Sequence, residues 1–429
     1  MNFLSIVILL LVLVAACFAL FKLLSSRRKP HCEGCSQCEG CPGVRKQLLL
    51  LLLAFSLPAG QLFASNLLYG PWVHNVDEHG FTVLWVSEKP SLDYVEIAPD
   101  DGTPFEAMAR ERIYETSYGR RFFGRFHCVR VESLAPGTTY RYRLVGQTVE
   151  DDSNPYRIVY GPRRLISSKK ISYSVKTLNA AADTCRFSVF NDIHFKNKRF
   201  TALAAPIDPA KTDFILLNGD IVSYAQSLDT VAKYSIQPIA AQAARLPLFF
   251  ARGNHESRGR AAYGVHSLFP TPTGEFWYSF RQGPAAFIVL DAGEDKPDSS
   301  HEYAGMADFD RYRERETRWL ETALQDPSFV SAPVKICIVH IPTLATKASW
   351  YSQRWITEHW APLLEKAGVD LMLSAHHHKW MCVEAGQDGK NYPVLVNSNM
   401  ERMDVMVTAG GIEVKTYDTE GQLCHRWSK

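Results

Sequence analysis

Five short groups of polar residues in the second half of the chain each follow a short apolar run. The groups are Asp192-Ile193-His194, Gly219-Asp220, Gly253-Asn254-His255-Glu256, His340 and His376-His377-His378. The runs before them are Arg186 to Phe190, Phe214 to Leu217, Leu248 to Phe250, Ile336 to Val339 and Leu371 to Leu373. Short apolar runs bounded by turn residues are typical of buried strands. We therefore expect an α/β fold in which the polar groups gather on one edge of a sheet, at the carboxyl ends of its strands, where open α/β folds bind ligands.

The residue types in these groups indicate a metal site. They supply two carboxylates, one amide and several imidazoles, a set of donors that suits Mn, Fe or Zn. One carboxylate can bridge two ions about 3.5–4 Å apart. The sequence therefore predicts a binuclear centre whose cofactors are two divalent or trivalent ions of these metals.

The order of the five groups resembles the motifs of the calcineurin-like metallophosphoesterase superfamily, from Arg186 to about Lys415. The resemblance implies a four-layer αββα sandwich with two metal positions. The first would be held by Asp192, His194, Asp220 and His378, and the second by Asp220, Asn254, His340 and His376. Asp220 would bridge the two ions, and His255 would be a catalytic imidazole that binds no metal and faces the scissile phosphate.

The last motif departs from the family pattern. The family has Gly-His-x-His, whereas this chain has Ala375 followed by three histidines. Alternation along an extended segment favours the i, i+2 pair His376 and His378 as ligands. We expect His377 to point elsewhere, into packing or a hydrogen bond.

The layout of the chain also resembles that of purple acid phosphatases. In that branch the first motif lacks its histidine, and a tyrosine three residues after the aspartate of the second motif binds ferric iron. Here His194 is present, and the nearest tyrosine, Tyr224, lies four residues after Asp220. We therefore expect a site without an iron-bound tyrosinate, in which Tyr224 is either part of the pocket wall or simply a packed aromatic residue.

The resemblance implies a metal-dependent phosphoric ester hydrolase in which metal-activated hydroxide attacks a phosphate ester. His255 would stabilise the developing charge or protonate the leaving oxygen. The chain contains neither a Gly-x-Ser-x-Gly motif nor a phosphate-binding loop motif. Two alternatives remain open: a phosphodiesterase or nucleotide-cleaving enzyme, and a non-catalytic surface binding protein that retains the metal site.

A different pattern precedes the catalytic region. Residues 66–177 contain alternating runs separated by turn residues, which predicts an all-β sandwich. The clearest runs are Phe81 to Trp85, Tyr94 to Ile97, Cys128 to Val131 and Tyr140 to Leu144. The segment Leu134 to Tyr142 resembles the corner of a fibronectin type III domain, with a tyrosine hydroxyl bonded to the backbone. Thr116 to Phe126, rich in arginine and aromatic residues, would be either a substrate-contacting or a solvated hairpin.

Residues 185–429 are expected to form the catalytic domain, after a linker at Leu178 to Thr184. Helices are predicted at Asp310 to Gln325 and Thr357 to Ala367. Closing strands are predicted at Val394 to Val396, Asp404 to Val407 and Ile412 to Val414. The turn-rich segments Ser257 to Glu275 and Gly293 to Asp308 are expected to cap the site and choose the substrate.

The first 65 residues have the patterns of membrane targeting. Within residues 1–43, Phe3 to Leu24 is apolar and long enough for a transmembrane helix that would attach the protein to a membrane. Cys32, Cys35, Cys38 and Cys41 follow, and this part resembles small cysteine-rich membrane proteins associated with ferrous iron transporters. Residues 44–64 resemble a secretory signal peptide with a cleavage site after Ala64.

These patterns predict an exported enzyme, either periplasmic or at the cell surface. The positive charges between the two apolar runs favour a cytoplasmic loop and an exported catalytic region. A signal peptide inside a reading frame is unusual, so two hypotheses remain. Either translation begins at Val44, or the chain is a fusion anchored by its first helix until cleavage.

Composition excludes two other classes of protein. The formal net charge is only +2, so the chain has no electrostatic footprint for nucleic acid. Five cysteines lie beyond the N-terminal segments, namely Cys128, Cys185, Cys337, Cys382 and Cys424. They are odd in number and unclustered, so they do not indicate a disulfide scaffold. The expected partner is a phosphate-ester substrate.

Overall fold

The computed structural model describes residues 67–166 and 172–429 of the chain. The transmembrane, cysteine-rich and signal-like segments predicted within residues 1–65 lie outside the described residues. Residues 65–429 form one compact unit. Within the described ranges, no helix is long and apolar enough to cross a membrane.

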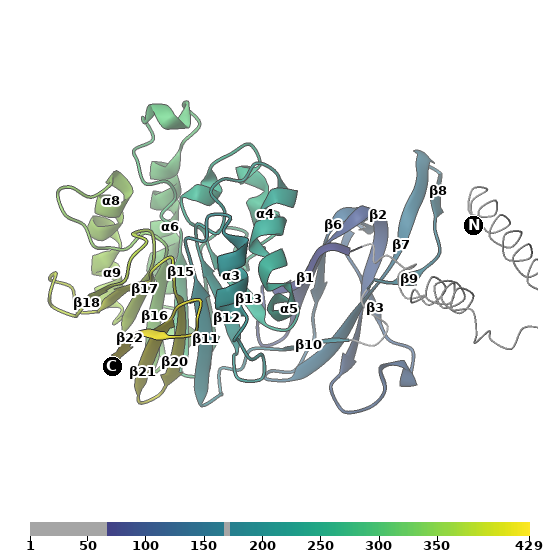
Figure 1. Cartoon of the computed structure of the whole chain (residues 1–429), viewed down its shortest axis with the longest axis horizontal. Helices are drawn as coiled ribbons and strands as arrows, with labels where there is room; N and C mark the ends of the chain where they lie inside the picture. The colour runs from purple at the N-terminus through teal and green to yellow at the C-terminus, as the bar shows by residue number, and fades with distance from the viewer. Residues whose placement is uncertain (1–66, 167–171) are drawn as a thin grey trace, which may run out of the picture. The chain divides into compact units, whose positions relative to one another are not determined.

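Two sheets lie face to face between two groups of helices (Figure 1). In the catalytic region the larger sheet has the order β13 (Pro247–Ala251), β12 (Phe214–Asn218), β11 (Thr184–Phe190), β20 (Arg402–Thr408), β21 (Gly411–Tyr417) and β22 (Leu423–Ser428). The second sheet has the order β14 (Tyr278–Gln282), β15 (Ala285–Leu290), β16 (Val334–Val339), β17 (Leu371–Ser374), β19 (Val394–Val396) and β18 (Met381–Val383). All five strands predicted before the polar groups are present.

Helices cover the outer face of each sheet. The larger sheet packs against α3 (Asn197–Ala204), α4 (Leu228–Ser235) and α5 (Ala240–Ala243). The second sheet packs against α6 (Phe309–Ala323), α7 (Pro327–Val330), α8 (Tyr351–His359) and α9 (Ala361–Lys366). The predicted four-layer αββα architecture is therefore confirmed.

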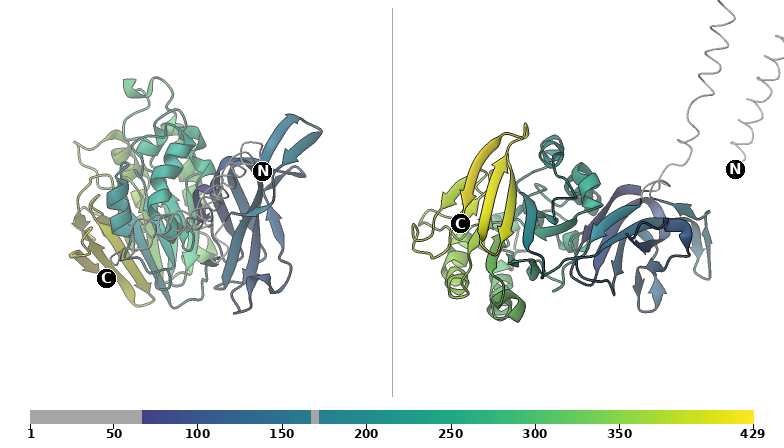
Figure 2. Two further views of the ribbon diagram at one scale, coloured as in Figure 1. Left: turned by 45° about the vertical axis from the view of Figure 1, so that its right-hand side comes forward. Right: turned by 90° about the horizontal axis from the view of Figure 1, so that it is seen from below.

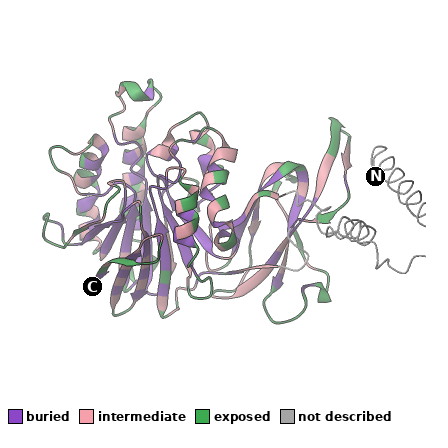
Figure 3. Cartoon of the chain, viewed as in Figure 1, coloured by how far each residue is buried: buried purple, intermediate pink, exposed green. Residues whose placement is uncertain are grey.

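The apolar runs lack a polar face because both faces of each sheet are covered. In β12, Phe214 and Leu216 face the opposite sheet, whereas Ile215 and Leu217 pack against the helices. Successive side chains of a strand point to opposite faces, so a strand between two layers must be apolar throughout. Figure 3 shows the strands of both sheets as mostly buried.

The prediction of one helix from Thr357 to Ala367 is wrong in its bounds. The chain forms α8 from Tyr351 and then α9 from Ala361, with a break at Trp360. Pro362 explains the break, because proline has no N–H to continue α8 but fits the first turn of a new helix. The helix predicted at Asp310 to Gln325 is present as α6.

The segments after the histidines divide between the two sheets. Strand β19 joins the second sheet parallel to β17, whereas β20 joins the larger sheet antiparallel to β11. Strand β22 was not predicted. The two capping segments contain only the short 3-10 turns η3 (His255–Ser257), η4 (Ala262–Ser267) and η5 (His301–Tyr303), as their turn-rich sequences indicate.

The N-terminal region is rich in β-strands, as predicted. Its strands are β1 (Leu67–His74), β2 (Phe81–Pro99), β3 (Arg112–Tyr114), β4 (Thr116–Ser117), β5 (Arg120–Arg121), β6 (Gly124–Val131), β7 (Thr139–Asn154), β8 (Arg157–Tyr160), β9 (Arg164–Leu165) and β10 (Tyr173–Lys176), with the 3-10 turn η1 (Phe105–Ala107). The two strands predicted at Phe81 to Trp85 and at Tyr94 to Ile97 are a single strand, β2. This strand continues through Ser87 to Ser91, where its pairing partners change from β1 and β6 to β7.

Two local predictions concern the turns of this region. The Ala135 N–H donates to the Tyr140 hydroxyl at 3.0 Å, so this tyrosine is tied to the backbone of the preceding corner. The β4–β5 hairpin within Thr116 to Phe126 is exposed. A fibronectin type III identity for residues 66–177 stays a prediction.

The β-rich region continues directly into the catalytic sheets (Figure 2). Strand β1 pairs in parallel with β13, with Val73 opposite Pro247, so one sheet runs through both regions. The Tyr142 hydroxyl donates to the Ala244 carbonyl at 2.7 Å across this join, and Arg125 forms an ion pair with Asp229 at 2.7 Å. The β-rich region is therefore fixed to the catalytic region by backbone pairing as well as by side chains.

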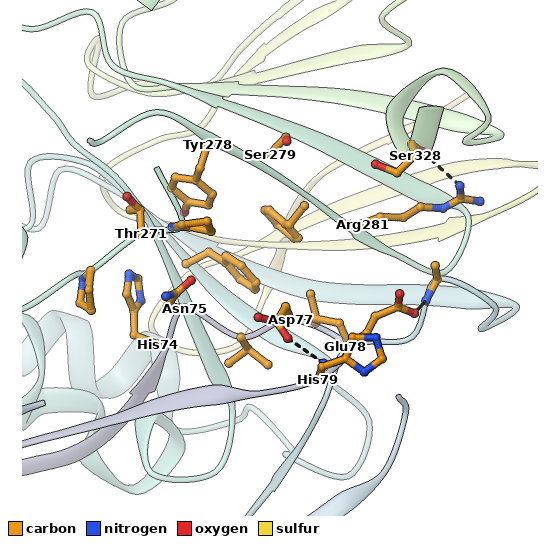
Figure 4. Close-up of a pocket in the computed structure, with 17 residues that line it drawn as sticks. His74, Asn75, Asp77, Glu78, His79, Thr271, Tyr278, Ser279, Arg281 and Ser328 are labelled. Atoms are coloured by element: carbon orange, nitrogen blue, oxygen red, sulfur yellow. Dashed lines mark hydrogen bonds between the residues drawn. The ribbon is translucent and has the colours of Figure 1, made fainter. Parts of the chain in front are cut away.

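A cavity of about 310 Å³ lies at this join (Figure 4). None of the predicted metal ligands lines it. Its charged side chains have partners: the Asp77 carboxylate accepts from the His79 N–H, Glu78 accepts from the Ala180 N–H, and Arg281 donates to the Ser328 carbonyl. The cavity therefore offers no unpaired charge for chemistry.

His74 makes the join sensitive to acid. It ends β1 beside β13, and burial lowers its pKa to about 3. A histidine whose folded-state pKa is depressed contributes full stability above its unfolded pKa of about 6.5 and loses it as pH falls. Between pH 6.5 and 5, we expect the unfolding free energy of the wild type to fall by roughly 1.5 kcal/mol more than that of His74→Gln. Urea unfolding at both pH values measures this, with exposed His79→Gln as the control; parallel losses in wild type and His74→Gln would contradict it.

Candidate metal centre

The predicted ligands come together at the carboxyl ends of parallel strands. They come from two sheets and not, as expected, from one. Asp192, Asp220 and Asn254 follow strands of the larger sheet, whereas His340 and His376 follow strands of the second. The two sheets point their carboxyl ends in the same direction, so loops from both meet at one site.

One cluster contains Asp192, His194 and His378. The His194 and His378 Nε2 atoms lie 3.3 Å apart, and the His378 Nε2 atom lies 3.2 Å from Asp192 Oδ1. Ligand atoms bound to one ion at about 2.0–2.2 Å lie roughly 3–3.5 Å from one another. These separations therefore suit a single ion.

The second cluster contains Asp220, His340 and His376, with Asn254 beside it. His340 Nε2 lies 3.2 Å from Asp220 Oδ2, and His376 Nδ1 lies 3.1 Å from Asn254 Oδ1. Asp220 Oδ2 also lies 3.8 Å from His194 Nε2 of the first cluster. Asp220 is thus between the two clusters, where a bridging carboxylate has to be.

Two buried atoms in these clusters are available to a cation. Asp192 Oδ1 and His340 Nε2 are buried and make no hydrogen bond of regular geometry. A buried polar atom without a partner is costly, and these two atoms point into the clusters. The donor set of carboxylate oxygens, imidazole nitrogens and an amide oxygen also suits Mn, Fe or Zn. The residues therefore fit a two-metal centre, and the ligand assignment stands as a proposal.

The clusters depend on an unusual backbone conformation. Five of the proposed ligands have positive φ angles, namely Asp192 (49°), His194 (47°), Asp220 (55°), His376 (71°) and His378 (59°). Residues other than glycine rarely adopt this region, and such strain collects at functional sites. The left-handed turns direct successive side chains inward where a continued strand would alternate them.

Hydrogen bonds fix the tautomers of two imidazoles. The Nδ1–H of His340 donates to the Asn218 carbonyl at 2.8 Å, which directs Nε2 toward Asp220, where a bound ion would take the place of the Nε2 proton. The Nδ1–H of His255 donates to the Ser223 carbonyl at 2.9 Å, so its Nε2 also faces Asp220, at 3.9 Å. A backbone acceptor on the far nitrogen is the usual way in which proteins orient a ligating or catalytic histidine.

The two carboxylates set the electrostatics of the centre. Burial opposes ionisation of Asp192 and Asp220, but the His340 charge and the hydrogen bonds that each carboxylate accepts together outweigh it and lower the pKa of both. Burial lowers and the two carboxylates raise the pKa of His340, with a net rise to about 10. Burial lowers the pKa of His194 and of His376 to about 4, which keeps both imidazoles neutral and able to donate a lone pair.

His377 does not join the clusters. Its Nε2 lies 3.3 Å from the side-chain nitrogen of Gln353, which is on helix α8. His376 and His378 lie in the clusters and His377 does not, as the alternation argument predicted. The chain is not extended here, however, because His376 and His378 have left-handed backbone conformations. The preceding Ala375 is fully buried, so its methyl group is accommodated.

Ser223 occupies the position three residues after Asp220. Its hydroxyl lies 3.3 Å from His194 Nδ1, on the side of the ring away from the cluster. Tyr224 is about half exposed and packs edge-on against Phe195, with ring centroids 5.3 Å apart. The described contacts of Tyr224 therefore place it beside the pocket and not among the ligand atoms.

Glu256 organises the centre in a way that the sequence alone did not reveal. Its buried carboxylate accepts four backbone N–H groups, those of Asp220, Ile221, Val222 and Gly253, at 2.8 to 3.2 Å. Burial and the Asp220 charge raise the pKa of Glu256 to about 7, although these four donors favour the ionised form. The only sequence signal for Glu256 was its position at the end of the third motif. Its role depends on hydrogen bonds from a loop that lies 35 residues earlier in the chain.

Asn191 and Asn397 form a second support. The Asn191 side-chain amide donates to Asp192 Oδ2 at 2.8 Å, and that of Asn397 donates to Asn191 Oδ1 at 2.7 Å. This pair orients the oxygen of Asp192 that the cluster does not use. No sequence signal connected residues 206 positions apart.

Comparisons with known proteins agree with this geometry. Residues 185–380 match the family model for calcineurin-like phosphoesterases. Purple acid phosphatase 18 of Arabidopsis thaliana is 23% identical over 341 residues, covering 74% of this chain and 66% of that protein. The chain thus spans just under two thirds of that relative's length.

The fold is also found among solved structures. Purple acid phosphatase PPD1 from yellow lupin (Lupinus luteus) seeds superposes with a TM-score of 0.61, over 83% of this chain and 73% of that one. The two sequences are only 14% identical, so this likeness is one of fold.

Gly253 is predicted to be essential for metal binding. A Cβ atom there would lie 2.2 Å from Asp220 Oδ1 and 2.4 Å from the Asp220 nitrogen. We expect Gly253→Ala to displace the Asp220 carboxylate and weaken Mn binding about tenfold or more, as changes beside metal ligands do. Calorimetric titration with Mn measures the loss. Gly264→Ala is the matched control, because its new Cβ would meet only the flexible Leu228 side chain, at 3.2 Å; equal Mn affinities in the two variants would contradict the prediction.

Proposed function

We propose that the chain hydrolyses phosphate esters at a binuclear centre formed by the two clusters, since residues 185–380 match the family model for calcineurin-like phosphoesterases. The proposal is carried by Asp220, whose carboxylate lies between the two clusters within 3.2 Å of His340 Nε2 and 3.8 Å of His194 Nε2. Two bound ions would neutralise the phosphate and lower the pKa of a water.

The chain's own residues supply the rest of the chemistry. Asp192, His194 and His378 would hold one ion, and Asn254, His340 and His376 the other. His255 binds neither in this assignment, and its oriented Nε2 faces the shared carboxylate. With a second proton on Nε2, it would hydrogen-bond to the phosphate as charge develops or give that proton to the leaving oxygen.

A phosphate monoester is the substrate class that we favour, and a diesterase or a non-catalytic binding protein remains an outcome of the tests below.

Export of the enzyme is also part of the proposal. It is supported by the signal-like sequence of residues 44–64, whether or not residues 1–43 precede it in the cell.

Two variants test the division of roles. We expect Asp220→Asn to lose most bound metal and nearly all activity, because a bridging ligand serves both ions. We expect His255→Ala to keep its metal and to lose about 10²–10⁴-fold in turnover. Mass spectrometry measures the metal content of each variant. Assays of the hydrolysis of an aryl phosphate and of its diester, with Mn, Zn or Fe, measure the activity. Full metal occupancy and unchanged rates in both variants would refute the assignment.

The iron-loaded protein is predicted to lack a strong visible charge-transfer band. Ser223, not tyrosine, stands three residues after Asp220, and Tyr224 packs against Phe195. No tyrosine hydroxyl is therefore expected to bind iron. An absorption spectrum after iron loading checks this. A violet protein that bleaches in the Tyr224→Phe variant would show that the tyrosine does reach the metal.

A further inference from the structure

Arg258 lies against the proposed catalytic histidine. Its Nη1 atom is 3.1 Å from His255 Nε2 and 3.4 Å from His255 Nδ1. The same Nε2 atom faces Asp220 Oδ2 at 3.9 Å. One N–H edge of the guanidinium therefore lies next to the position where a phosphate bound at the proposed centre would meet His255.

The other edge of the guanidinium is held by a carboxylate. The Arg258 Nε and Nη2 atoms donate to Glu294 Oε1 and Oε2, both at 2.8 Å. The Glu294 side chain is only 2% exposed, whereas that of Arg258 is 31% exposed. A two-point pair of this kind fixes the plane of the guanidinium, so Nη1 is directed toward His255.

Glu294 is itself held by both capping segments. The Ser257 hydroxyl donates to Glu294 Oε1 at 2.9 Å, and the Tyr303 hydroxyl donates to Oε2 at 3.2 Å. Ser257 Oγ also lies 2.7 Å from the Asn254 carbonyl oxygen, which is the alternative acceptor for the same proton. The position of Arg258 is thus built into the loops around the centre and does not depend on a flexible surface side chain.

We propose that Arg258 binds a terminal phosphate oxygen through Nη1 and makes the site prefer phosphate monoesters to diesters. This inference rests on the proposed function. A monoester has three terminal oxygens and carries nearly two negative charges at neutral pH, because its second pKa is about 6. A diester has two terminal oxygens and one charge. If each of two bound ions took one terminal oxygen, a monoester would have a third terminal oxygen left for a further cationic donor, and a diester would have none.

The test compares Arg258→Gln with wild type on an aryl phosphate and on its bis-aryl diester, using the Mn-loaded full chain. We expect kcat/KM for the monoester to fall about 10- to 100-fold, as for a lost hydrogen bond to a charged group. We expect less than a threefold change for the diester. Calorimetric titration with inorganic phosphate should show a similar loss of affinity, and this readout does not depend on turnover.

Arg260→Gln is the matched control. Arg260 lies in the same segment, and its Nε donates to the Gln226 carbonyl at 3.2 Å, away from the centre. Both substrates and phosphate binding should be unchanged in this variant. Arg258→Lys should recover only part of the monoester activity, because lysine keeps the charge but loses the two-point pairing with Glu294.

Loss of the arginine leaves the buried Glu294 carboxylate unpaired, so the melting temperature of each variant is measured. If the Arg258→Gln variant is unfolded, the double variant Arg258→Gln with Glu294→Gln is assayed in its place, because the two side-chain amides can hydrogen-bond to each other. Equal losses on monoester and diester, or no loss on either, would overturn the inference. If the Mn-loaded wild type hydrolyses neither ester, the proposed function fails, and the phosphate titration still decides whether Arg258 binds phosphate.

Discussion

Two buried carboxylates, Asp192 and Asp220, govern the chemistry and much of the local structure of this protein. Isolated buried charges are strongly unfavourable, so the fold surrounds these groups with imidazoles, with backbone N–H donors and with side-chain amides. Their negative field raises the pKa of His340 to about 10. The same field makes the site a strong attractor of cations, which is the physical basis of the proposed two-metal centre.

The ligand geometry requires the loops to be held in strained conformations. Five proposed ligands have positive φ angles, and Glu256 collects four N–H groups from two loops beneath them. Glycines at 219 and 253 allow those loops to approach closely, since a Cβ at Gly219 would lie 2.5 Å from His340 Nδ1. Strain of this kind persists only when the surrounding structure determines the conformation. Here the strands of two sheets, packed through one apolar core, provide that rigidity.

Outside the two clusters, two further attachments hold parts of the chain to the catalytic region. The segments that carry Arg258 and Glu294 are joined by a partly buried two-point ion pair, which also places Arg258 beside the proposed catalytic histidine. The β-rich region is attached on the other side through the β1–β13 pairing. The proposed preference for monoesters depends on the first of these attachments, because it positions Arg258 beside His255.

The sequence by itself determined which residues are the proposed metal ligands, which strands precede them and the layered fold. These are local properties: a short apolar run indicates a buried strand, and the group that follows it lies at the strand's end. The tertiary structure alone decided which sheet carries each ligand, that β2 is one strand, and that α8 and α9 are two helices. It also decided the pairing of Arg258 with Glu294 and of Asn191 with Asn397. Those contacts join residues 36 and 206 positions apart, and only the packing of the two sheets brings such distant segments together.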